Sequence, residues 1–339
     1  MNSLLTALNE RRTLAVGGVP TQSQGYVLAK LLVDATQPII HICANDREMD
    51  LCATALQFFA PDCMIIQLPA WDCLPYDRVS PAHAIIAERV NALCHLAHAE
   101  SLPQTFVVLT TIGAAMQKLP PRANFRDSSF VLITGDLVDR DELIAFLIAN
   151  GYSRISKVME PGEFAVRGSI IDIFPPDSEN AIRLDLFDDV IESIKFFETL
   201  SQITHSKCER ITLQPIGEIR LDENGVTRFR MGYRDHFGAV IKDDPLYESI
   251  SQGRHYPGAE HWLPLFFEKL ETLFDYVPNA VVSYDTSIAA IHVDRLEVLS
   301  DYYDARVKAL NSKEGGQYHP LPPAMLYLLD DEWQKLLSK

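Results

Sequence analysis

Two hydrophobic patterns follow one another along the chain. In the first part, short and almost wholly apolar runs alternate with stretches in which apolar residues recur every three or four positions. Unbroken apolar runs are typical of strands buried on both faces of a parallel sheet, and the longer spacing is typical of covering helices. Strands are expected at 13–16, 38–44, 63–68 and 105–109, and helices around 4–8 and at 29–33, 45–59 and 82–99.

A second pattern begins at position 129. One strand (130–134) and one helix (139–149) lead into short segments with strict alternation at 169–174, 181–187 and 190–197, punctuated by Pro and Gly pairs. Alternation in 181–187 places three aliphatic residues on one face of its strand and Arg183, Asp185 and Phe187 on the other. Helical patterns return after position 213, with one further strand at 280–284.

These patterns predict an α/β protein with an insertion. We expect an α/β unit that covers 1–128 and continues at 214–339, with an α+β domain inserted at 129–213. The longest apolar runs are far shorter than the roughly 20 residues that cross a bilayer, and the first ten residues lack a secretory signal's charge order. We therefore expect a cytoplasmic protein that does not bind membranes.

The charge distribution bears on the choice of partner. The chain carries 30 Lys and Arg against 46 Asp and Glu, a net charge of −16, and the three expected units carry −2, −7 and −7. Binding to nucleic acid depends on cationic side chains that neutralise phosphates. Because no unit is basic, we expect little direct nucleic-acid binding by this chain.

Cysteine and histidine give no sign of a metal site. The scattered cysteines and the absence of any C-x-x-C pair indicate reduced thiols in a chain that needs no disulfides. His95 and His98 could share a helix face, but a zinc site needs three or four ligands and no further group accompanies them. We expect no metal. The six cysteines are Cys43, Cys52, Cys63, Cys73, Cys94 and Cys208.

A Gly-rich turn after the first expected strand lies where α/β proteins bind phosphate. Against the pattern G-x-x-x-x-G-K-[ST], Gly18 matches, whereas Ser23 replaces the second glycine, Gln24 the lysine and Gly25 the hydroxyl residue. The missing lysine would contact the β and γ phosphates, and the missing hydroxyl would hold Mg²⁺. The turn therefore lacks the groups that bind a triphosphate.

The acidic half of such a site is altered as well. Asp285 follows an apolar strand, but Thr286 replaces the second carboxylate that would activate water. Loss of both halves predicts an ATPase-type fold, degenerate and inactive, rather than an enzyme. The acidic run at 330–332 resembles a motor's acidic box but is better explained as a solvated helix start. No G-x-S-x-G, H-E-x-x-H or G-x-G-x-x-G motif supports another enzyme class.

The exposed face of strand 181–187 admits two interpretations. Phe187 could cover the edge of its own hairpin while Arg183 pairs with Asp185 or Glu192. Alternatively, Arg and aromatic side chains on a flat sheet face form a protein-binding hot spot, because these residue types dominate such sites.

Three long motifs follow one another along the chain: PAWDCLPYDRVSP at 69–81, EPGEFAVRGSIIDIFP at 160–175 and RLDLFDDVIESI at 183–194. In this order they resemble the N-terminal module of the bacterial transcription-repair coupling factors. That module is similar to the excision-repair protein UvrB, which implies a degenerate RecA-like, helicase-type domain whose two lobes are 1–128 and 214–339, with an inserted domain between them. UvrB has a DNA-gripping hairpin for which this chain has no room after Pro81.

The resemblance implies that the inserted domain recruits the damage sensor UvrA. The positions that match the family's recognition surface are Arg167, Arg183 and Phe187, with the arginines as donors to partner carboxylates and Phe187 as an apolar anchor. Binding of RNA polymerase and DNA, and ATP-driven translocation with Mg²⁺, belong to further domains of the family. We therefore expect no cofactor for this chain.

Two alternatives stay open at this point. One is a nucleotide hydrolase or nucleotide-dependent DNA binder with an unorthodox phosphate loop at Gly18, which calorimetry with ATP and Mg²⁺ would reveal. The other is a packing module that only holds a longer protein in an autoinhibited shape, and such a module would have no affinity for UvrA.

Overall fold

The computed structural model describes residues 14–126, 128–176, 178–240, 244–312 and 318–337. The helix expected around 4–8 lies outside the described residues. No helix in these ranges is long and apolar enough to cross a membrane.

A four-stranded parallel sheet forms the centre of the larger unit and confirms the α/β class. Its strand order is β12-β1-β3-β2, and every neighbouring pair runs parallel. Helices cover both faces, as the unbroken apolar runs predict. The strands are β1 (Ile39–Cys43), β2 (Ile65–Leu68), β3 (Val107–Thr111) and β12 (Val281–Tyr284).

Alternate residues of β1 pack on opposite faces of this sheet. Ile39 and Cys43 join the core beneath α2 (Gln24–Leu32) and α3 (Asp46–Phe59). Ile40 and Ile42 join the larger core on the other side. The helices of that larger core include α4 (His83–Ala97) and α5 (Ile112–Ala115).

The strand expected at 13–16 is wrong for its described residues, because residues 14–20 form neither strand nor helix. The physical reason is that its apolar side chains do not join the core, since Ala15 and Val16 are exposed, and β1 pairs with β12 on one side and β3 on the other. Both edges of β1 are therefore occupied by strands from later in the chain. A short 3₁₀ turn, η1 (Thr21–Ser23), leads directly into α2.

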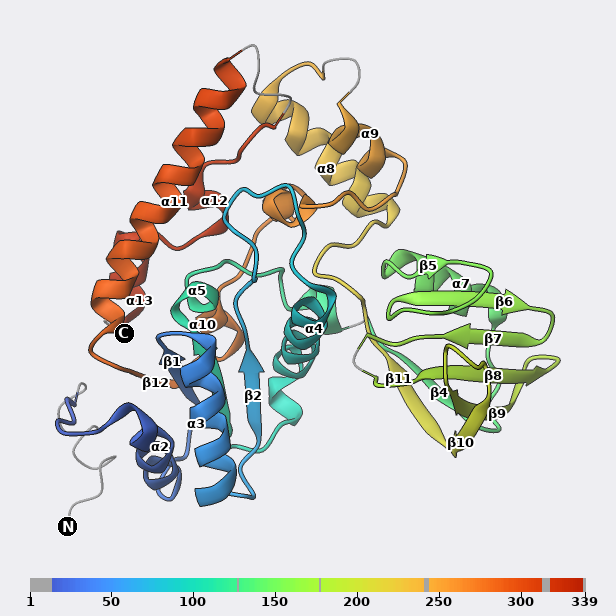
Figure 1. Cartoon of the computed structure of the whole chain (residues 1–339), viewed down its shortest axis with the longest axis horizontal. Coiled ribbons are helices and arrows are strands. Elements are labelled where there is room, and N and C mark those ends of the chain that lie inside the picture. Colours follow the sequence, from blue (N-terminus) through green and yellow to red (C-terminus); the bar gives the residue numbers. More distant parts are fainter. Residues whose placement is uncertain (1–13, 127, 177, 241–243, 313–317, 338–339) are drawn as a thin grey trace.

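A separate group of strands lies beside the parallel sheet (Figure 1). A six-stranded sheet has the order β10-β9-β8-β7-β6-β5 and is antiparallel except at β5 and β6. β4 and β11 form a two-stranded antiparallel sheet. Helix α7 packs on one face of these strands, and together they enclose a hydrophobic core that is separate from the cores of the parallel-sheet unit. The elements are β4 (Phe130–Ile133), α7 (Arg140–Ala149), β5 (Ser153–Arg154), β6 (Glu163–Arg167), β7 (Ile170–Ile173), β8 (Ala181–Phe187), β9 (Val190–Phe197), β10 (Thr204–Cys208) and β11 (Arg210–Leu213).

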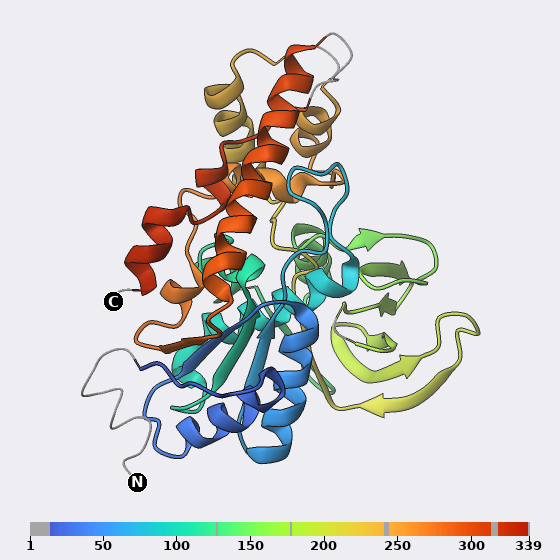
Figure 2. The same cartoon turned by 60° about the vertical axis from the view of Figure 1, so that its left-hand side comes forward.

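The remaining chain is mainly helical. The 24-residue helix α11 (Ile288–Asn311) starts beside the parallel sheet and extends to the end of the molecule where α8 and α9 lie, as both views show (Figures 1 and 2). The other elements are η2 (Ala99–Ser101), α6 (Ala123–Arg126), α8 (Glu223–Phe237), α9 (Pro245–Ser251), η3 (Ala259–Leu265), α10 (Leu273–Tyr276), α12 (Pro323–Leu326) and α13 (Asp330–Leu337).

Candidate functional site

The residues that align with a phosphate-loop pattern do not lie between a strand and a helix among the described residues. Gly18 is exposed in the left-handed region, with φ of 74°, and no strand precedes it among the described residues. Ser23 precedes α2 without a side-chain cap hydrogen bond. Gln24 and Gly25 are buried in the first turn of that helix.

Gln24 and Asp285 contact each other across 261 positions of sequence. The Gln24 amide Nε2 donates to Asp285 Oδ2 at 3.0 Å, and the amide Oε1 lies 3.3 Å from His41 Nε2. His41 Nδ1 in turn lies 3.2 Å from the Ser283 hydroxyl. A neutral His41 with its proton on Nε2 satisfies every bond in this chain, with the Ser283 hydroxyl as donor to Nδ1.

The protonation states fit that chain of hydrogen bonds. Burial lowers the pKa of His41 to about 4, so the ring is neutral at pH 7. The backbone and side chain of Ser287 donate to Asp285 and hold its pKa below the usual range, and Gln24 adds a further bond. Gln24 and Asp285, which the sequence pattern aligns with the lysine and acid of an ATP site, therefore bond to each other.

The other two positions have structural explanations. A Cβ on Gly25 would lie 2.6 Å from Ala55 Cβ and 2.9 Å from the Cys52 carbonyl oxygen, so glycine allows α2 to approach α3 closely. Thr286 is exposed in the turn between β12 and α11.

The three residues predicted to bind a partner, Arg167, Arg183 and Phe187, lie on one face of the six-stranded sheet. Strand pairing places Arg167 opposite Ile170 and Arg183 opposite Asp172, and Phe187 ends β8 on the Arg183 side. The alternation predicted for β8 is confirmed, because its three aliphatic side chains are buried on the α7 side: Ile182, Leu184 and Leu186.

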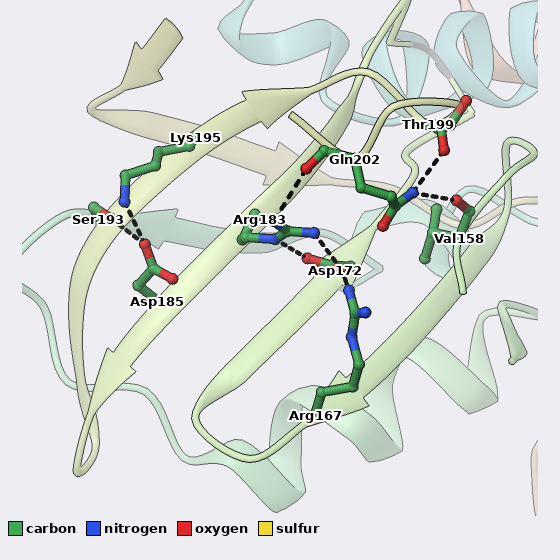
Figure 3. Close-up of polar contacts among 9 residues, drawn as sticks. All are labelled: Val158, Arg167, Asp172, Arg183, Asp185, Ser193, Lys195, Thr199 and Gln202. Atoms are coloured by element: carbon green, nitrogen blue, oxygen red, sulfur yellow. Dashed lines mark hydrogen bonds and ion pairs between the residues drawn. The ribbon is translucent and has the colours of Figure 1, made fainter. Parts of the chain in front are cut away.

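A buried carboxylate joins the two arginines (Figure 3). Asp172 is fully buried, and both of its oxygens accept from Arg183, Oδ1 from Nε at 2.7 Å and Oδ2 from Nη2 at 3.0 Å. Arg167 Nη2 also donates to Asp172 Oδ2. The forked geometry of a guanidinium suits a carboxylate, and the bonds to Asp172 raise the pKa of Arg183.

The environment of Arg183 leaves it little freedom. Its Nη1 donates to the Gln202 carbonyl at 3.4 Å, and its guanidinium carbon lies 4.7 Å from the centre of the Phe197 ring. The Arg183 side chain is 17% exposed, against 47% for Arg167. Arg167 is therefore the more accessible of the two cations.

The interpretation that paired Arg183 with Asp185 or Glu192 is wrong, because Arg183 pairs with Asp172. Asp185 instead accepts from Lys195 at 2.6 Å and Ser193 at 2.8 Å (Figure 3). Burial alone would raise the pKa of Asp185, but these two bonds lower it. The chain next to Phe187 turns at Asp188, which has φ of 51°.

Phe187 does not cover its own hairpin. Its side chain is 71% exposed at the end of β8. Burying an aromatic side chain is strongly favourable, so an exposed one on a sheet face is available to a partner.

Sequence reasoning missed the role of Asp172. The signal was present in the sequence, because Asp172 is a single charged residue within the aliphatic strand at 170–173. It missed the bond between Gln24 and Asp285 as well, for which the sequence carries no local signal.

The remaining candidates have local explanations. His95 and His98 bond through Nδ1 to the backbone carbonyls of Asn91 and Cys94. Asp330 begins α13, which confirms the helix start predicted for the acidic run. All six cysteines are free. The described part of the chain brings together no group of three or more residues that could hold a metal ion.

Comparison with known proteins gives two kinds of match. Residues 130–218 match the family model of the UvrB interaction domain. Proteins named transcription-repair-coupling factor are 31% identical over 315 residues in Rickettsia bellii, 35% over 271 residues in Haemophilus influenzae and 34% over 274 residues in Escherichia coli.

These matches cover most of this chain but only part of each relative. They include 93% of the chain for the Rickettsia protein and 80% for the other two. The chain spans about a quarter of the length of the relatives, 28% of the first and 23% of the others. The chain thus belongs to the transcription-repair-coupling factor family, in which it corresponds to the N-terminal module.

Proposed function

We propose that this chain is a non-catalytic protein-binding module that recruits UvrA to stalled RNA polymerase in transcription-coupled excision repair. In this proposal, contacts with polymerase and DNA belong to other domains of the longer family members, together with ATP, Mg²⁺ and translocation. The chain itself uses no cofactor.

The observation that carries the proposal is the face of the six-stranded sheet. Phe187 stands out from this face with its side chain 71% exposed, and Arg167 lies on the same face with its side chain 47% exposed. An exposed aromatic residue and an arginine on one sheet face are the residue types that protein-binding hot spots favour. The whole face lies within the segment that matches the UvrB interaction domain.

The bond between Gln24 and Asp285 supports the proposal that the chain is non-catalytic. A degenerate RecA-like domain, with lobes at 1–128 and 214–339 and an insertion at 129–213, would place Gln24 and Asp285 where an active relative binds phosphate and Mg²⁺. In this chain the two residues bond to each other, and Gln24 carries no charge for a phosphate. ATP binding that a change at Gly18 abolishes would contradict this part of the proposal.

The decisive experiment measures binding of UvrA to the whole chain and to variants of the sheet face. We expect Phe187→Ala and Arg167→Ala each to weaken UvrA binding at least about fivefold, roughly 1 kcal/mol, because truncation of a hot-spot residue costs that much or more. Phe58→Ala is the matched control, since Phe58 is 78% exposed on α3, outside the matched domain.

Two results would contradict the proposal. Absence of UvrA binding by the unmodified chain would favour the purely autoinhibitory module. Unchanged binding in both Phe187→Ala and Arg167→Ala would show that UvrA uses another surface. Circular dichroism on each variant checks that its fold is intact.

A further inference from the structure

An exposed apolar row crosses the end of the six-stranded sheet. Phe187 of β8 pairs with Val190 of β9, and Val190 forms an isolated antiparallel bridge with Leu137 from the segment before α7. Residues directly opposite each other on paired strands project to the same face. The apolar row Phe187, Val190 and Leu137 therefore extends from β8 across the hairpin to a third segment.

Both ends of the row are highly exposed, and Val190 between them is half-buried. Leu137 is 79% exposed, more than any other large apolar residue in the described part of the chain, and Phe187 is 71% exposed. Single exposed apolar residues are ordinary, but adjacent ones form a patch that marks an interaction site.

The backbone holds Leu137 firmly in this position. Gly135 N donates to the Ile191 carbonyl at 2.8 Å, Ile191 N donates to the Asp136 carbonyl at 3.0 Å, and Val138 N donates to the Asp189 carbonyl at 2.8 Å. Val138 itself is buried in the core under the sheet. Leu137 is therefore presented on a rigid scaffold and loses little backbone freedom on binding.

Charges on either side of the row define what it can accept. Asp136, Asp188 and Asp189 are exposed around the row, whereas Arg167 lies farther along the same face. A complementary partner surface has an apolar centre bordered by basic side chains, with a carboxylate facing Arg167.

We propose that Leu137 is a second apolar anchor for UvrA, which contacts the row Phe187, Val190 and Leu137 with an apolar patch bordered by basic side chains. The inference rests on the proposed function and extends its site beyond Arg167, Arg183 and Phe187. The row is continuous with Phe187, and all of it lies within the matched UvrB interaction domain.

The test compares UvrA binding by Leu137→Ser and Leu200→Ser in the whole chain. Leu200 is 75% exposed in the turn between β9 and β10, at the opposite end of β9 from Val190, so it controls for the general loss of an exposed leucine. We expect Leu137→Ser to weaken UvrA binding at least about fivefold and Leu200→Ser to leave it unchanged.

A double variant sharpens the result. If Leu137 and Phe187 contact the same patch of UvrA, the effect of combining Leu137→Ser with Phe187→Ala differs from the product of the two single effects. Binding by Leu137→Ser that equals the unmodified chain, or equal losses in both serine variants, would overturn the inference while leaving the proposed function standing. Absence of binding by the unmodified chain would instead overturn the proposed function, and the inference with it.

Discussion

Asp172 shows how one buried residue determines what a surface can offer. Its carboxylate takes two bonds from Arg183 and one from Arg167, so much of the cationic character of this face is already neutralised within the chain. Removal of one partner from a buried ion pair leaves an uncompensated charge, which costs more than the intact pair contributes. Arg183 is therefore both a structural residue and a candidate binding residue.

At the residue scale, we expect Arg183→Ala to lower the free energy of unfolding by about 3 kcal/mol, because Asp172 loses its bidentate partner. Lys195→Ala is the matched control on the same face, since its pair with Asp185 is partly exposed, and we expect it to cost no more than about 1 kcal/mol. Urea unfolding measures both values. Equal losses of unfolding free energy in the two variants would show that the buried Asp172 pair contributes no more to stability than the partly exposed pair.

At the scale of the element, the close packing of α2 on α3 determines which residues Gln24 can reach. Helix α2 meets α3 at Gly25, where an added Cβ would lie 2.6 Å from Ala55 Cβ. This contact places Gln24, the preceding residue, within reach of His41 and Asp285. The position of α2 therefore decides that Gln24 bonds to His41 and Asp285.

We expect Gly25→Ala to lower the free energy of unfolding by about 1 to 3 kcal/mol through overpacking. The sign of the change in unfolding free energy is informative, because replacing glycine by alanine inside an unconstrained helix stabilises the protein by about 1 kcal/mol. Gly17→Ala is the control, since no atom lies within 4 Å of its added Cβ. Thermal and urea unfolding of both variants measure the difference. A Gly25→Ala protein as stable as the original would contradict the packing described for α2 and α3.

At the scale of the whole molecule, a buried ion pair joins α4 to the segment that follows β11. Arg89 of α4 donates through Nε to Glu218 Oε1 at 2.6 Å and through Nη2 to Oε2 at 3.2 Å, and both side chains are almost fully buried. Trp71 Nε1 donates to the same Glu218 Oε1 at 2.9 Å. Glu218 is the last residue of the matched UvrB interaction domain. The pair therefore fixes where the chain re-enters the larger unit.

We expect Glu218→Gln to lower the free energy of unfolding by about 3 to 5 kcal/mol, because Arg89 would keep a buried charge without its counterion. Glu268→Gln is the matched control, since its pair with Arg228 is exposed and 3.7 Å long, and its loss is expected to be within about 1 kcal/mol. Calorimetric unfolding distinguishes the two. A Glu218→Gln protein as stable as the control would show that the buried pair does not stabilise the fold more than the exposed pair.

Local features of this protein follow directly from its sequence. The alternation at 181–187 gives β8 its exact bounds and its buried face, and Asn45 caps α3 by accepting from Glu48 N at 3.0 Å. Such features depend on residues only a few positions apart, so periodicity and capping chemistry are enough to predict them. The helix start at Asp330 belongs to the same class.

The sequence by itself determined the α/β class, the strands and first covering helices of the parallel sheet, and the polar face of β8. Only the tertiary structure decided that 14–16 forms no strand, that Gln24 bonds to Asp285, that Arg183 pairs with Asp172, and that Leu137 lies in a row with Phe187. These outcomes depend on which strands are neighbours, on their register and on how closely helices approach. Those relations join segments up to 261 positions apart, and no local pattern encodes them.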